Sequence, residues 1–139
     1  MSTYVRIGAS LNDLLDPEKN PGMRIATVDM RGGATISAVL NAIAAEFPTP
    51  DYPALNNGNQ ELFRDILADW MLKNWQTWLE VEVLLAERDC REQLTLLHDI
   101  AAAFEYAKHS AIRERLYQTK AEGFDDASFV LRMYVFQSG

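Results

Sequence analysis

The order of strand-like and helix-like segments constrains the fold of this chain more than any other feature of the sequence. Residues 23–30 ("MRIATVDM") are rich in apolar and β-branched residues and precede a Gly-Gly pair, so they predict a strand. Residues 36–47 repeat apolar side chains at helical spacing after Thr35, a residue type that caps helices. Three prolines predict a loop over residues 48–59, and a second amphipathic helix begins at about Gln60.

The second half of the chain continues this alternation. Residues 77–87 ("TWLEVEVLLAE") are apolar on one face and partly apolar on the other, which predicts a mostly covered strand. Residues 91–109 predict a third helix, and residues 111–116 extend it or begin a fourth that ends near Gly123. The stretch "SFVLRMYVF" (128–136) predicts the last strand.

Helices between successive strands imply parallel pairing, because a parallel connection needs a long crossover. We therefore predict an α/β fold in which helices pack on a three-stranded parallel sheet. The length of 139 residues predicts a single domain over residues 1–139. Residues 1–22 form an N-terminal extension of less certain structure, in which "YVRIGASLNDLLD" (4–16) fits an extra strand and a short helix.

Composition indicates an intracellular protein. No apolar run approaches the roughly 18 residues typical of a membrane-spanning helix. The opening "MSTYVRIGAS" has neither the basic region nor the apolar region of a secretory signal. The single cysteine, Cys90, excludes an internal disulfide framework and is typical of a reducing compartment. We therefore expect a cytoplasmic location and no membrane partner.

The negative charge is concentrated in two segments. The formal net charge is -7 with a pI near 4.7, and no basic cluster stands out, so nucleic acid is not expected as a direct partner. Residues 46–70 hold five acids against one base, and residues 80–92 hold five acids against two bases. These segments contribute -4 and -3, which equals the net charge. Glu80, Glu82 and Glu87 in the second segment are expected to be solvated, with a wider acidic surface as the alternative.

Three carboxylates form one row on the second predicted helix. Glu61, Asp65 and Asp69 follow one another at intervals of four residues, and like charges at that spacing repel by roughly 0.2–0.5 kcal/mol per pair. Arg64 lies three residues after Glu61 and screens only part of the row. An acidic row that costs stability is expected where a basic partner supplies the missing charge. A plain solvated helix face is the alternative.

The sequence offers little for catalysis. His98 and His109 are expected to be ordinary helix residues, and Cys90 with His98 is a poor candidate for a thiolate–imidazole pair. The stretch "RGGAT" (31–35) lacks a phosphate-loop pattern and predicts a tight turn, with anion binding at the following helix as the alternative. Carboxylates bind hard cations, but nothing completes a cage of ligands. We predict no enzyme activity, no catalytic or metal site and no cofactor.

The second predicted helix also carries a family resemblance. The stretch "NQELFRDIL" (59–67), followed by Trp70, resembles the barstar family, whose second helix opens with Asn-x-Asp-x-Leu-x-Asp-x-Leu. Asn59 matches the Asn of this pattern, Glu61 the first acid and Asp65 the second. The order of strands and helices is similar to the barstar fold as well. Trp70 lies on the apolar side of the helix and is expected to pack in the core.

The resemblance implies an intracellular inhibitor of a basic ribonuclease. Barstar-type proteins use helix carboxylates in place of RNA phosphates to block the active site. The implied partner is a basic ribonuclease or another basic toxin, for which this chain would be the immunity protein or antitoxin. Asp65 is the expected central anion, and the other expected contacts are Glu61, Asp69, Asn59, Asn57 and Tyr52. The alternative is a non-inhibitory acidic binding module of the same fold with a different basic protein partner.

Overall fold

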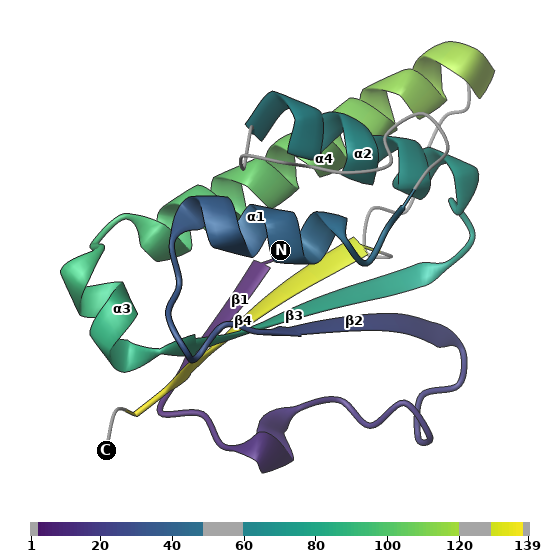
Figure 1. Cartoon of the computed structure of the whole chain (residues 1–139). Helices are drawn as coiled ribbons and strands as arrows, with labels where there is room; N and C mark the ends of the chain where they lie inside the picture. Colours follow the sequence, from purple (N-terminus) through teal and green to yellow (C-terminus); the bar gives the residue numbers. More distant parts are fainter. Residues whose placement is uncertain (1–2, 49–59, 120–128, 138–139) are drawn as a thin grey trace.

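Four parallel strands form a single sheet in the order β1-β4-β3-β2 (Figure 1). The computed structural model describes residues 3–48, 60–119 and 129–137. The strands are β1 (Thr3–Ile7), β2 (Met23–Asp29), β3 (Trp78–Ala86) and β4 (Phe129–Phe136). The α/β class and the parallel sheet are therefore confirmed, as are the three predicted strands to within one residue at each end.

The predicted strand count of three is wrong. The additional strand, β1, comes from the N-terminal extension and pairs with β4, with Val5 opposite Met133. The exposure of β1 explains why the sequence predicted it only as an option. Tyr4, Val5, Arg6 and Ile7 are all exposed, so no alternation of buried and exposed residues marks the segment. The short helix expected nearby is a 3-10 turn, η1 (Leu11–Asp13).

Helices α1 (Ile36–Ala44), α2 (Gln60–Lys73) and α4 (Leu96–Thr119) cover one face of the sheet, as Figure 1 shows. Helix α1 contacts β2, α4 contacts β4, and α2 packs along α4. The start of the second helix at Gln60 is confirmed. So is the cap of the first helix, since the Thr35 hydroxyl accepts a hydrogen bond from the Ala38 amide at 3.1 Å.

The third helix differs from its prediction. It begins at Leu96 rather than residue 91, and it runs without a break to Thr119, so residues 111–116 extend it. A separate short helix, α3 (Glu87–Glu92), precedes it directly after β3. The expected helix end near Gly123 and the loop over 49–59 lie outside the described residues.

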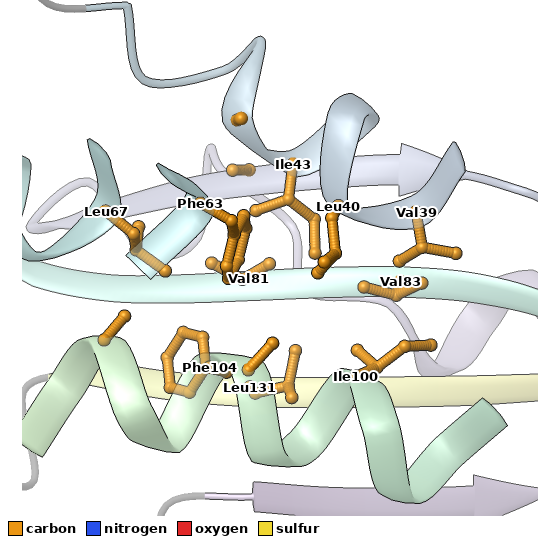
Figure 2. Packing of buried hydrophobic residues seen from close by; sticks show 14 of the residues in the cluster. Val39, Leu40, Ile43, Phe63, Leu67, Val81, Val83, Ile100, Phe104 and Leu131 are labelled. Carbon is orange, nitrogen blue, oxygen red and sulfur yellow. The ribbon is translucent and has the colours of Figure 1, made fainter. Parts of the chain in front are cut away.

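One hydrophobic core joins the helices to the sheet. Figure 2 shows Val39, Leu40 and Ile43 of α1 converging on β3 with side chains of α2 and α4. The core residues with no more than 1% exposure on the two central strands are Leu79, Val81, Val83, Leu85, Phe129, Leu131, Met133 and Val135. Because side chains alternate along a strand, the residues between them point to the opposite face of the sheet.

That second face carries buried charge. Glu80 and Glu82 of β3 are 0% and 1% exposed, so the expectation that they are solvated is wrong. The covering segment, residues 8–22, crosses this face on the side away from the helices (Figure 1). Glu82 binds it directly, because the Leu15 amide donates to Oε2 at 3.0 Å. The Thr27 hydroxyl donates to Oε1 of Glu82 at 2.9 Å.

Tyr134 of β4 completes the surroundings of Glu82. Burial, and then the nearby carboxylate of Glu82, raise the pKa of the Tyr134 hydroxyl. The tyrosine therefore remains a neutral donor at physiological pH. One donor from β2 and one from the covering segment satisfy the two oxygens of this buried carboxylate, which ties the N-terminal residues to the sheet.

Replacing Glu82 tests this arrangement. In Glu82→Gln one oxygen becomes an amide nitrogen that donates, so one of the two donors, the Leu15 amide or the Thr27 hydroxyl, loses its acceptor. We expect the free energy of unfolding to fall by about 1–3 kcal/mol, measured by urea denaturation. Glu18→Gln, an exposed change in the covering segment, is the control and should have little effect. A loss below about 0.5 kcal/mol in Glu82→Gln would contradict the proposed tie.

Candidate functional site

Helix α2 is held firmly by its apolar side. Five of its residues are buried, namely Phe63, Ile66, Leu67, Ala68 and Met71. Phe63 and Leu67 point toward β3 in Figure 2. Trp70, which was expected in the core, is partly buried against it, with its ring 5.0 Å from that of Phe47. These contacts fix the orientation of the opposite, acidic side.

The predicted carboxylates lie on this opposite side. Glu61 and Asp65 are exposed, the Asp65 side chain being 47% exposed, whereas Asp69 is half-buried at 27%. Glu61 lies in the first turn of α2, where the helix dipole favours an acid. The structure thus brings three of the six predicted contact residues together. The other three, Tyr52, Asn57 and Asn59, lie outside the described residues.

The acidic row is better compensated than the sequence analysis assumed. Lys73 follows Asp69 at i+4, and its Nζ lies 2.9 Å from Oδ2 of Asp69. Arg64 Nε lies 3.6 Å from Oδ1 of Asp65, a looser and more exposed contact. The sequence-based expectation counted only bases within residues 61–69, and Lys73 lies just beyond them. Asp65, at the centre of the row, therefore carries the repulsion from acids on both sides.

Helix α4 contributes residues that the sequence analysis missed. A hollow of about 440 Å³ lies between the helices, lined on α2 by Asp65 and Asp69 among others, and on α4 by Ser110, Glu114 and Gln118. A smaller hollow of about 170 Å³ is lined by Gln60, Glu61, Arg64 and Tyr106. Residues 106, 110, 114 and 118 recur every four positions, so they form a second row beside the first. Helical spacing places these four residues on one side of α4. The sequence does not show that this side lies beside α2.

Tyr106 and Glu114 give this surface an aromatic and a further acidic group. The Tyr106 side chain is exposed at 64%, and aromatic residues of this kind are common anchors in protein interfaces. Glu114 accepts a hydrogen bond from Gln118 Nε2 at 3.2 Å, which keeps it on the surface. Glu87, a further candidate, is half-buried and lies 3.7 Å from Arg91 on α3. We define the acidic surface as Glu61, Asp65, Asp69, Tyr106 and Glu114.

His98 and Cys90 differ in their surroundings. The His98 side chain is 83% exposed on α4 and lies 3.6 Å from Asp99. Burial, and then the nearby charges of Asp89 and Glu87, raise the pKa of the Cys90 thiol. A thiol with a raised pKa is a poor nucleophile. Among residues 3–48, 60–119 and 129–137, no group of three or more His, Cys, Asp or Glu side chains is placed to hold a metal ion.

The turn over residues 31–35 is structural. Gly33 has a φ of 142°, a conformation that favours glycine, so the predicted tight turn is confirmed. The buried carboxylate of Asp89 accepts a hydrogen bond from the Ala34 amide at 3.2 Å, and Gln93 Nε2 donates to the Ala34 carbonyl at 2.6 Å. A protein carboxylate thus occupies this turn and repels any added anion.

Comparisons with known proteins add no family. No protein-family model, curated protein or solved structure matches the chain. Membership of the barstar family therefore stays a prediction from the sequence. In the part of the chain that the structure describes, no helix combines the length and the apolar character needed to cross a membrane.

Two substitutions in the row should affect stability differently. Asp65→Asn removes repulsion from both Glu61 and Asp69 and loses only the long, exposed contact with Arg64, so we expect the free energy of unfolding to rise by about 0.5 kcal/mol. Asp69→Asn removes one repulsion but also the pair with Lys73, so its effect should be near zero or destabilising. Urea denaturation at low ionic strength measures both. Destabilisation by Asp65→Asn of more than about 0.5 kcal/mol would show that this acid supports the fold instead.

Proposed function

We propose that the acidic surface of α2 and α4 binds a basic protein, and that the chain inhibits a basic ribonuclease toxin by occupying its active site. The observation that carries this proposal is the position of Asp65. Asp65 is exposed between Glu61 and Asp69, on a helix whose opposite side is buried in the core. Electrostatic repulsion within the row is relieved when a partner brings positive charge.

The rigidity of α2 supports an inhibitory role. Carboxylates that are already held in place lose little conformational freedom on binding, which favours affinity. A ribonuclease active site must be lined with cationic groups to hold RNA phosphates, and carboxylates on a helix present negative oxygens without a bond to cleave. The net charge of -7 would accelerate the encounter with such a site, most strongly at low salt. The resemblance to barstar supplies the ribonuclease as the class of target.

The test is inhibition of a small basic ribonuclease encoded beside this chain. Co-expression of the pair should rescue growth, and Asp65→Ala should weaken binding by about 2–5 kcal/mol, because a buried cation in the partner is left unpaired. Isothermal titration calorimetry measures the affinity. Glu18→Ala removes the same charge from the opposite side of the sheet and serves as the matched control.

The results separate the proposal from its closest rival. A change below about 0.5 kcal/mol for Asp65→Ala would exclude this surface as the binding site. Recovery of a basic partner whose ribonuclease activity is unaffected, or which has none, would retain the binding surface and remove inhibition. That outcome is the non-inhibitory binding module.

A further inference from the structure

A second polar cavity lies on the other face of the sheet, away from the acidic surface. It has a volume of about 290 Å³ and lies beside the edge strand β1 and the covering segment. Its lining residues are Tyr4, Val5, Arg6, Asp13, Arg132, Met133 and Tyr134. In the register of β1 and β4, Tyr4 is opposite Arg132 and Arg6 is opposite Tyr134. The two arginines thus stand diagonally across the strand pair, on the same face of the sheet.

Arg132 is held in a fixed orientation. Its Nε donates to Oε2 of Glu80 at 2.8 Å, and Glu80 is 0% exposed. The Trp78 indole donates to the other oxygen of Glu80 at 3.0 Å, which fixes the carboxylate in turn. The guanidinium also stacks on the Tyr4 ring, 4.9 Å from its centroid. Glu80 thus occupies the Nε edge of the guanidinium, and the Tyr4 ring covers one of its faces. The Nη groups of Arg132 are the donors that remain available.

Arg6 supplies a second set of donors at the same cavity. Its Nε lies 3.1 Å from Oδ2 of Asp13, and its side chain is 64% exposed. Among the described residues, the Nη groups of Arg6 and Arg132 and the Tyr4 hydroxyl have no hydrogen-bond acceptor. Of the lining residues in the described part of the chain, Asp13 alone carries a carboxylate. Hydrogen-bond donors therefore converge on this space in excess of acceptors.

We propose that this cavity binds a small oxyanion, the phosphate or carboxylate group of a small molecule. Planar guanidinium groups match the geometry of both anions and bind them with charge-assisted hydrogen bonds. Glu80 orients Arg132 for this role as a positioning residue. Asp13 opposes the anion, because it competes for Arg6 and adds negative charge. The site is independent of the acidic surface on α2, which lies on the helical side of the sheet.

Calorimetric titration with inorganic phosphate and with citrate tests the site, at an ionic strength held constant with sodium chloride. We expect saturable binding of at least one of these probes to the full chain. Preference for phosphate identifies a phosphate group, and preference for citrate identifies a carboxylate. Arg6→Gln should weaken binding about tenfold, the loss expected for one charge-assisted contact. Arg113→Gln, an exposed change on α4, removes the same charge elsewhere and should leave affinity unchanged.

Asp13→Asn provides a test of opposite sign. It frees Arg6 and removes the opposing charge, so it should tighten anion binding by about threefold or more. Damage to the fold cannot produce tighter binding, so this variant separates a site effect from instability. The absence of saturable binding of either probe would overturn the proposal. So would equal loss of affinity in Arg6→Gln and Arg113→Gln, or weaker binding in Asp13→Asn.

Discussion

Burial of β3 on both faces is the constraint on which the rest of the structure depends. On the helical face its apolar side chains belong to the same core as the buried side chains of α1, α2 and α4 (Figure 2). On the other face it places Glu80 and Glu82 where water is excluded, so both carboxylates must be satisfied by the protein. The covering segment and Arg132 meet that need. The rigid helix α2 and the fixed arginine are both consequences of this one strand.

Different charged groups stand exposed on the two sides of the sheet. Carboxylates of α2 and α4 are gathered on the helical side, beside the exposed ring of Tyr106. Guanidinium groups of β1 and β4 are gathered on the opposite side, beside the covering segment. A protein with a net charge of -7 can keep an anion-binding cavity only if its acids are held elsewhere or paired. The two proposals therefore concern different surfaces and different ligands.

Local sequence signals predicted the parts of the fold that local physics determines. The cap at Thr35, the start of α2 at Gln60 and the strands β2, β3 and β4 follow from side-chain types and spacing. The edge strand β1 and the buried state of Glu80 and Glu82 depend on contacts with distant residues. No periodicity reports such contacts, so the sequence offered β1 only as an optional strand within residues 4–16 and misjudged the two glutamates. The i+4 partner of Asp69 was visible in the sequence and was overlooked. The row of residues 106, 110, 114 and 118 on α4 was not predicted, because only the packing of α4 against α2 places it beside the acidic residues.

The proposed function depends on a basic protein binding to the acidic surface of α2 and α4. The most direct measurement is a ¹H–¹⁵N NMR titration of this chain with the basic ribonuclease that we propose as its partner, since such a titration reports the backbone amides individually. We expect the largest changes in amide chemical shift within residues 60–73 and 106–118, with little change over residues 3–22. Shifts concentrated on β1 and the covering segment, with α2 unchanged, would contradict it.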